Sequence, residues 1–417
     1  MVSKSKFVRR GLTLVEILIA LVMTLIVLGA MMFSFRAAST QIARGRSVME
    51  LSNNLRTAEN LLRSDTDGVT VDTRPWSRTA SPNGYFELIE SLPVPPVAGR
   101  LTDASNGIGV EAIVGDLDDV LAMTVRSGDR PFRGRFNGEI VESDVAEVIW
   151  WTSVEDSDGD GTATLGDYGD TVTLHRRVLL IRPDLPASSA GASSAMEFFL
   201  ANDISARVVN GQVVSTNSLA DLARRENRFA RDGNPANSPF DLNRALLNRY
   251  QLSADNLATV GDPELPARAG DDIVLTDVLG FDLQVYSPDT PIRVQDGLAT
   301  EPDDPGYSGG GVAGQGAYID LSIGGAGQFS EPPALIIEGQ SSPVVSYDTF
   351  STHYETDRTG TDGIDTDGIN GVDDDNERIS SPPYPHVLRG MKATLRAVER
   401  KSNQVRQLEV ISSFVPQ

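Results

Sequence analysis

The sequence contains no cysteine and few histidines. With no cysteine and 3 histidines among 417 residues, the chain cannot form a disulfide bond, a thiolate metal site or a cysteine nucleophile. The histidines, His175, His353 and His386, are too few for a metal centre built from several imidazoles. Function must therefore depend on other residue types.

Positive charge is also scarce. The chain has 36 lysines and arginines against 58 aspartates and glutamates, which gives a formal net charge of -22 and a pI near 4.5. Such a surface repels nucleic acid, so we expect no nucleic-acid partner. Carboxylate oxygens instead suit hard divalent cations. The length of 417 residues allows one large domain or two of ordinary size. Hydrophobic residues make up 40% of the chain, which is enough for a sizeable core.

Motifs for catalysis are missing from the sequence as well. It has no nucleophile elbow, P-loop, zinc motif or cysteine–histidine pair. The run GGGVAG at 309–314 has the G-x-G-x-x-G spacing, but no clear strand precedes it and no helix follows, so we predict a flexible loop. We therefore expect that the protein is not an enzyme.

One long hydrophobic run is present, from Leu12 to Phe35, and it carries a single charge, Glu16. A helix rises about 1.5 Å per residue, so this run can cross the roughly 30 Å apolar core of a bilayer. Basic residues precede the run, at Lys4, Lys6, Arg9 and Arg10. This charge pattern predicts a cytoplasmic amino terminus and an exported remainder.

Three interpretations of the run compete. A cleaved secretory signal would need a cleavage site after the run, where RAAST at 36–40 fits weakly, and its apolar part is ordinarily shorter. A plain signal anchor explains the length but leaves Glu16 without a reason. An ionisable group within a membrane segment is costly and marks a functional position.

The third interpretation rests on a motif. The segment RRGLTLVEILIAL resembles the prepilin motif of type IV pilins and type II secretion pseudopilins: a short basic leader, a glycine, an apolar residue, and a glutamate at the fifth position after the glycine. The resemblance implies that prepilin peptidase removes residues 1–11 by cutting after Gly11. Leu12, which stands where phenylalanine is most common, then becomes an N-methylated amino terminus.

The resemblance also implies a role for Glu16. Cleavage creates a positively charged amine within an apolar helix, and an unpaired buried charge is expensive. In this family the glutamate is thought to meet the terminal amine of a neighbouring subunit, which sets the axial register of the filament. The implied partners are prepilin peptidase, the inner membrane before assembly, and other pilin or pseudopilin subunits.

The helix is predicted to continue beyond the membrane, over about 12–63. Its membrane or filament-core half is 12–35 and its amphipathic half is 36–65. Apolar residues recur every three or four positions in the second half, at Val48, Leu51, Leu55, Ala58 and Leu62. This stripe predicts packing against a sheet, and SDTDG at 64–68 supplies a stop.

The remainder, 66–417, is predicted to be an exported globular domain of mainly antiparallel strands. The predicted strands are Val120–Val125, Val145–Trp151, Thr171–Ile181, Ile273–Tyr286 with a break near Gly280, and a carboxy-terminal hairpin of Met391–Ala397 and Val405–Phe414. Short helices are expected over 218–225 and 241–250, and long insertions over about 183–270 and 287–385, the second partly flexible. Of Trp150 and Trp151, one is expected in the core and the other at a partner contact. The fold class is α+β, and the architecture resembles large minor pilins and pseudopilins of the PilW or J type.

Two acidic stretches are candidate calcium sites. In DSDGDGTATLGD at 156–167, the spacing of a twelve-residue calcium loop places ligands at Asp156, Asp158, Asp160, Thr162 and Asp167. Aspartate replaces the usual final glutamate, and strands are expected on both sides, so a solvated acidic hairpin is the alternative. A weaker candidate, without standard spacing, lies within 355–378 and contains Asp365, Asp367, Asp373 and Asp375.

These features lead to one expectation and one alternative. We expect a minor pilin or pseudopilin, single-pass in a bacterial inner membrane and then assembled through its first helix into a type IV pilus or a pseudopilus, with a periplasmic or extracellular head. Its large head favours a tip position. The alternative is a membrane-anchored, exported calcium-binding or adhesive protein that does not polymerise.

Overall fold

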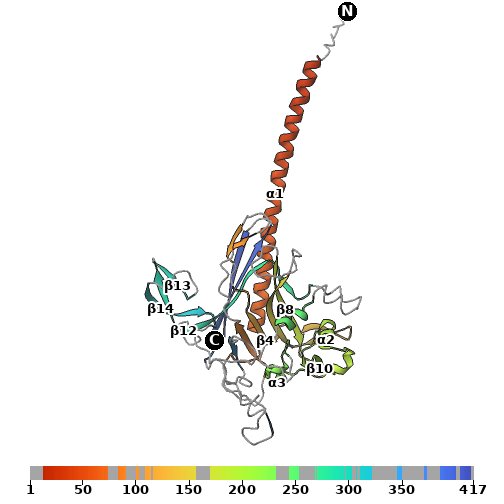
Figure 1. The fold of residues 1–417 in the computed structure, drawn as a ribbon, viewed down its shortest axis with the longest axis vertical. Helices are drawn as coiled ribbons and strands as arrows, with labels where there is room; N and C mark the ends of the chain where they lie inside the picture. The colour runs from red at the N-terminus through yellow and green to blue at the C-terminus, as the bar shows by residue number, and fades with distance from the viewer. Residues whose placement is uncertain are drawn as a thin grey trace, which may run out of the picture.

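The chain folds into one long helix and mostly antiparallel sheets, so the predicted α+β class is confirmed (Figure 1). The helix projects from a head that contains the strands, and the amino terminus lies at its far end. The computed structural model describes residues 13–73, 83–90, 100–102, 109–113, 116–155, 170–231, 244–252, 268, 270–295, 297–302, 307, 310–321, 345–349, 371–372, 386–400 and 404–414.

The long helix, α1, spans Leu14–Asp67, and its 54 residues make it about 80 Å long. Thr13 caps its amino-terminal end and Gly68 follows its last residue. The helix ends at Asp67 and not at the predicted residue 63, because contacts with the sheet stabilise its last turn. The carboxylate of Asp65 accepts hydrogen bonds from Trp150 at 2.8 Å and from Arg176 at 2.6 and 2.7 Å.

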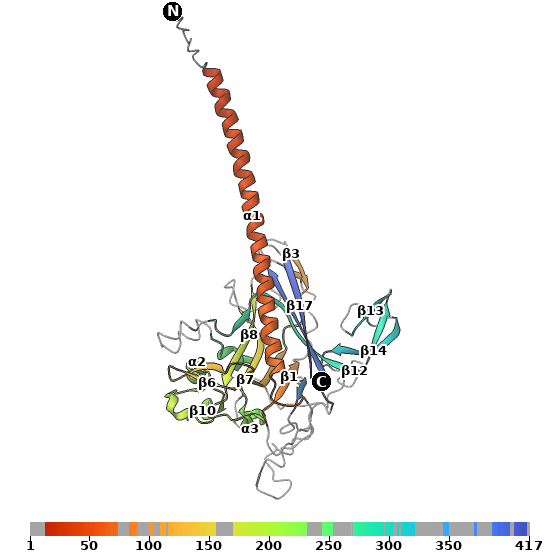
Figure 2. The same cartoon turned by 180° about the vertical axis from the view of Figure 1, so that it is seen from behind.

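The two halves of α1 have opposite surroundings. In the first half the apolar side chains are exposed, from Leu14 at 81% to Phe35 at 75%. In the second half the predicted stripe is buried against the sheets: Leu55 is 3% exposed and Leu62 is fully buried. Figure 2 shows this half lying across the strands of the head. The amphipathic prediction is therefore confirmed.

A six-stranded antiparallel sheet forms the centre of the head. Its strand order is β11-β8-β7-β4-β1-β15. The strands are β1 (Phe86–Glu90), β4 (Val120–Arg126), β7 (Val145–Glu155), β8 (Thr171–Leu180), β11 (Ile273–Leu275) and β15 (Val345–Asp348). The predicted strands β4, β7 and β8 are confirmed, and all of β8 pairs with residues 146–155 of β7.

A second antiparallel sheet has the order β13-β12-β16-β17, with β14 also paired to β12. Its strands are β12 (Val278–Gln295), β13 (Leu298–Thr300), β14 (Gly311–Ile319), β16 (Gly390–Glu399) and β17 (Gln404–Ser413). The carboxy-terminal hairpin is confirmed by the β16–β17 register. The apolar stripe of α1 belongs to a core that includes residues of both sheets.

Short elements cover the other face of the six-stranded sheet. They include η1 (Ala187–Ala190), α2 (Ala195–Ala201), β9 (Ala206–Val209), β10 (Gln212–Thr216), α3 (Leu219–Leu222), η2 (Arg225–Asn227) and α4 (Arg244–Arg249). Two further hairpins are β2 (Arg100–Thr102) with β3 (Gly109–Ile113), and β5 (Phe132–Phe136) with β6 (Glu139–Ser143). In both views α2 and β10 lie on the opposite side of the head from β13 and β14 (Figures 1 and 2).

This second layer corrects the expectation for the tryptophans. Trp150 is fully buried beside α1, whereas Trp151, 1% exposed, packs into a separate core with Phe198, Phe199 and Phe229. Both side chains are therefore core residues, and the predicted partner contact at one of them is wrong. The reason is that apolar side chains from residues 195–230 pack on the face of the six-stranded sheet that carries Trp151. The alternation of residues within one strand could not show that this face is covered.

Three details differ from the predicted strands. The break in the segment 273–286 lies at residues 276–277, where Asp277 has a φ of 55°, shortly before the predicted Gly280; at Gly280 itself β12 continues, but its register against β16 shifts between Val278 and Gly280. The loop predicted over 309–314 is a strand from Gly311 onward, because β14 pairs with the long β12 through backbone groups that glycine also has. The segment 287–385 also contributes β13 and β15.

Candidate functional site

The predicted processing site begins with Gly11 and Leu12, which lie outside the described residues. Glu16 lies in the first turn of α1, where it forms a capping box with Thr13. The Thr13 backbone N–H and hydroxyl donate to Glu16 Oε2 at 2.9 and 3.0 Å. No described residue donates to Oε1. Glu16 thus holds the start of the helix and keeps one oxygen free to accept a further donor.

The first half of α1 is an apolar surface with no cover from the head. Among the described residues, α1 is the one helix long and apolar enough to cross a membrane; its most apolar window has a mean hydropathy of 2.7 and is 0% buried. An exposed apolar surface of this size is stable only against lipid or other apolar helices. The first half of α1 is therefore a contact surface by its chemistry.

The second half of α1 is fixed to both sheets. Its last turn binds the six-stranded sheet through the Asp65–Arg176 ion pair, in which the Arg176 and Asp65 side chains are 15% and 2% exposed. It binds the second sheet through Thr66, whose hydroxyl lies 2.8 Å from that of Ser412. Arg63 also donates to the carbonyl of Ile411 at 3.1 Å. Movement of the helix would therefore be transmitted to the whole head.

Gly68 lets the chain leave the helix close to β4. A Cβ at this position would lie 2.5 Å from the carbonyl oxygen of Arg126 and 2.7 Å from the Val125 side chain. The Arg126 backbone N–H also donates to the Gly68 carbonyl at 2.6 Å. A larger residue would push the end of α1 away from the sheet.

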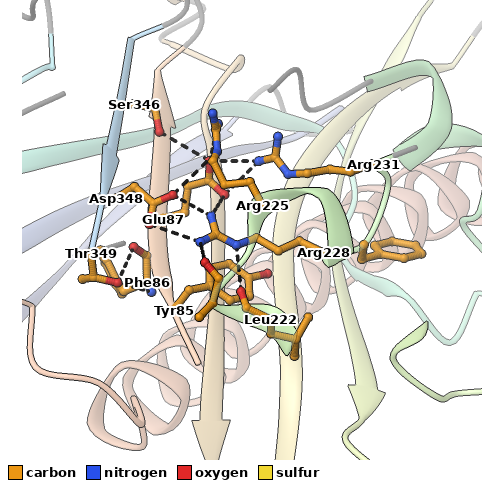
Figure 3. Close-up of polar contacts among 12 residues, drawn as sticks. Tyr85, Phe86, Glu87, Leu222, Arg225, Arg228, Arg231, Ser346, Asp348 and Thr349 are labelled. Atoms are coloured by element: carbon orange, nitrogen blue, oxygen red, sulfur yellow. Dashed lines mark hydrogen bonds and ion pairs between the residues drawn. The ribbon is translucent and has the colours of Figure 1, made fainter. Parts of the chain in front are cut away.

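A buried cluster of charges ties the second layer to the edge of the six-stranded sheet (Figure 3). Glu87 of β1 accepts hydrogen bonds from Arg225 at 2.6 Å, Arg228 at 2.7 Å and Arg231 at 2.8 Å. Arg228 also donates to Asp348 of β15 at 2.6 Å. Burial raises the pKa of Glu87, but attraction to the three guanidinium groups outweighs burial and brings the pKa well below its ordinary value.

In the same cluster, arginine side chains form ion pairs with both Glu87 and Asp348. Burial lowers the pKa of Arg228, but Asp348 and Glu87 raise it well above the ordinary value, so Arg228 stays charged. Its guanidinium also lies 3.9 Å from the centre of the Tyr85 ring. Because Glu87 and Asp348 are held by arginines in the interior, we assign the cluster to positioning β15 and the arginine-bearing segment, not to catalysis.

His175 and Ser153 form a close pair inside the sheet. Ser153 Oγ lies 2.7 Å from His175 Nε2, and the imidazole stacks on Trp151 with the ring centres 5.1 Å apart. Such a pair resembles a nucleophile and its base, but Ser153 is 4% and His175 2% exposed, so a substrate has no access. Burial lowers the pKa of His175 to about 4. His175 is therefore a buried packing residue.

The calcium ligands predicted from sequence are not among the described residues. The set from Asp156 to Asp167 lies between the end of β7 at Glu155 and the start of β8 at Thr171, so strands flank it as predicted. The weaker set from Asp365 to Asp375 also lies outside the described residues. Neither prediction is tested by the structure.

Sequence reasoning missed a different acidic cluster, which the fold assembles. Glu90, Asp116, Asp118 and Asp119 each place a carboxylate oxygen within 4.8 Å of the others. Burial, with the nearby charges of Asp320, Asp116 and Asp118, raises the pKa of Glu90 to about 10. The one signal in the sequence was DLDD at 116–119, which has no standard loop spacing.

Comparison with known proteins gives no family for the chain. No protein-family model matches it, and no curated protein or solved structure does. The function must therefore be inferred from the helix, the residues at its start and the way its other half is held.

Proposed function

We propose that the chain is a minor pilin-like or pseudopilin-like structural subunit. In this proposal prepilin peptidase cuts after Gly11, and the processed chain enters a type IV pilus or a type II secretion pseudopilus through α1. The observation that carries the proposal is the prepilin-like motif placed at the start of a helix whose first half is apolar and uncovered.

The uncovered half of α1 has a use at each stage of such a pathway. In the bilayer, lipid covers its side chains; in a filament, the equivalent helices of other subunits replace the lipid. Both environments are apolar, so the exchange exposes little hydrophobic surface to water. The head is held to α1 through the buried stripe and the Asp65 ion pair, so it travels with the helix.

Glu16 supplies the polar contact in this exchange. Its carboxylate would meet the amine that cleavage creates at Leu12 of a neighbouring subunit, and Oε1 is available as an acceptor because Thr13 donates to Oε2. Opposite charges in an apolar environment attract strongly, whereas either charge alone is costly there. The pair would favour one axial position of the subunit over all others.

The size of the head supports a minor or tip position. A head with a second layer on one side and the β12–β14 extension on the other would hinder the close helical packing of a main shaft subunit. A single subunit at a tip meets fewer neighbours and tolerates this bulk. In this proposal the head acts in assembly or contact and not in catalysis.

The mature amino terminus tests the proposal. The full chain is produced in a bacterium that has prepilin peptidase, extracted from membranes with detergent and analysed by mass spectrometry. We expect a chain that begins at N-methylated Leu12. An intact leader, or a cut near residue 38, would refute the proposal and favour an anchored, exported protein that does not polymerise.

A further inference from the structure

Four carboxylates from two separate segments meet at the end of β1. Glu90 is the last residue of β1, and Asp116, Asp118 and Asp119 precede β4. These strands are antiparallel neighbours in which Ile89 pairs with Val120, so the register brings Glu90 beside Asp119. One oxygen from each of the four lies within 4.8 Å of the others. The backbone of the sheet itself therefore fixes the cluster.

Glu90 and Asp119 are buried in contact with each other, and each has an oxygen that no described N–H or hydroxyl group outside the pair meets. Glu90 is 2% exposed and Asp119 is fully buried. Among the described residues, none donates to Glu90 Oε2 or to Asp119 Oδ1. A buried carboxylate oxygen without a donor is costly, so such atoms are rare unless something else meets them. Both side chains already contribute an oxygen to the cluster.

Three of the four carboxylates form no ion pair with a described basic side chain. Within the described part of the chain, no lysine or arginine forms an ion pair with Glu90, Asp116 or Asp119. Further negative groups lie near: Asp282 and Asp320 both act on Asp119. Like charges in a buried site repel unless protons or a cation neutralise them. This cluster contrasts with Glu87, three residues away, which three arginines neutralise.

We propose that Glu90, Asp116, Asp118 and Asp119 bind one divalent cation, and that the cation is calcium. Four carboxylates form an all-oxygen set, which selects hard cations. Four oxygens that lie within 4.8 Å of one another can all reach a single cation between them. Calcium takes about six to eight oxygen ligands in a flexible geometry, whereas magnesium usually keeps several waters and binds only about one or two carboxylates, so a set of four carboxylates favours calcium.

The site lies where the two sheets join. The Phe281 backbone N–H of β12 donates to the Asp116 carbonyl at 2.8 Å, and the Leu283 N–H donates to Asp119 Oδ2. Residues 116–119 thus connect β4 of one sheet with β12 of the other. A cation bound to this segment and to Glu90 would stabilise the junction, because it binds the folded chain and not the unfolded one.

Calcium binding at this site does not depend on the proposed assembly function or on the acidic stretch at 156–167. Full-length protein in detergent is stripped with EDTA, and its unfolding midpoint is measured with and without saturating CaCl₂. We expect calcium to raise the midpoint by about 3–5 °C. Isothermal titration calorimetry should show binding heat at the same calcium concentrations.

Two sets of variants locate the site. Asp119→Asn keeps an acceptor for the Leu283 N–H but removes one negative charge. We therefore expect the metal-free variant to unfold at the same temperature as the metal-free wild type or at a higher one. We expect its calcium-dependent shift to fall below a third of the wild-type shift. Glu90→Gln should behave in the same way. The controls, Asp129→Asn and Glu139→Gln, change exposed carboxylates outside the cluster and should keep the full shift.

The result that would overturn the proposal is equally specific. Wild-type protein with no calcium-dependent shift and no binding heat would refute the site. So would a full shift that persists in both Asp119→Asn and Glu90→Gln, because calcium would then bind elsewhere in the chain. A shift with MgCl₂ at the same concentration and none with CaCl₂ would refute the assignment to calcium.

Discussion

At the scale of single residues, Glu16 and Glu87 are two carboxylates in opposite surroundings. Glu87 sits in the interior with arginines as fixed partners. Glu16 sits on an exposed apolar helix with only its own cap as a partner. The first arrangement is complete within one chain, whereas the second leaves Glu16 Oε1 as the acceptor for the neighbouring subunit's amine that we propose.

The role of Glu16 can be tested by Glu16→Ala. We expect the variant to reach the membrane and lose its leader, because neither step needs the carboxylate to pair with an amine. We expect its incorporation into filaments to fall at least tenfold, measured by quantitative immunoblotting of sheared filaments. Glu50→Ala is the matched control, since Glu50 is an exposed glutamate on the same helix outside the apolar half. Equal incorporation of both variants would contradict the role.

His175 makes stability depend on pH. Its pKa falls from an ordinary 6.5 to about 4 in the folded chain, so the unfolded chain takes up a proton between these values that the folded chain does not. The free energy of unfolding therefore decreases as the pH falls from 6.5 to about 4, and His175 does not change it above this range. With about 1.4 kcal/mol per pH unit for one proton, the loss at pH 5 is about 2 kcal/mol.

The measurement compares wild type with His175→Gln, which cannot be protonated. Free energies of unfolding are determined in urea at pH 7 and pH 5 for both proteins. We expect the pH 7 to pH 5 difference to be smaller in the variant by about 2 kcal/mol, whatever the substitution costs at pH 7. An identical difference in the two proteins would show that His175 is protonated in the folded state.

At the scale of elements, α1 is held by the few side chains of its buried stripe. Leu62→Ala should lower the free energy of unfolding by about 2–5 kcal/mol, because Leu62 is fully buried among residues of the central core and the substitution leaves a cavity. Met49→Ala is the control on the same helix; Met49 is 63% exposed, so its change should stay within about 0.5 kcal/mol. Chemical unfolding of the full chain in detergent measures both.

Elements defined by local pattern were predictable from sequence. The stripe from Leu51 to Leu62 repeats with the helical period, and residues 391–414 alternate on either side of a short turn. What could not be predicted depends on pairing between distant segments. Val345–Asp348 is too short to be distinctive, and it becomes a strand because β1 accepts it as a neighbour.

The candidate sites divide in the same way. Glu16 was found because its motif is local, with the glycine and the glutamate on one short segment. The carboxylate cluster was missed because Glu90 and Asp119 are brought together by strand pairing and not by spacing. The end of α1 was placed too early because Asp65 reads as part of a stop signal, whereas Trp150 and Arg176 hold it in the helix.

At the scale of the whole molecule, the head and the apolar half of α1 are separate structural units. The most apolar window of the helix is 0% buried. A variant lacking residues 1–35 should therefore remain in solution without detergent and unfold within about 1 °C of the full chain. Light scattering and thermal unfolding measure these two properties.

A deeper truncation supplies the control. Removing residues 1–57 also removes Leu51 and Leu55, which are 7% and 3% exposed, so the unfolding midpoint should fall markedly. If removal of residues 1–35 lowers the midpoint as much as the deeper truncation, then the head and the apolar half of α1 are not independent.

The pairing of β1 with β15 constrains the order of events during synthesis. The ribosome produces residues 86–90 long before residues 345–348, and the two segments are neighbours in the finished sheet. Until the later segment emerges, β1 offers an open row of backbone donors and acceptors to any passing strand. This edge of β1 must therefore stay protected in the nascent chain until residues 345–348 have been made and can pair with it.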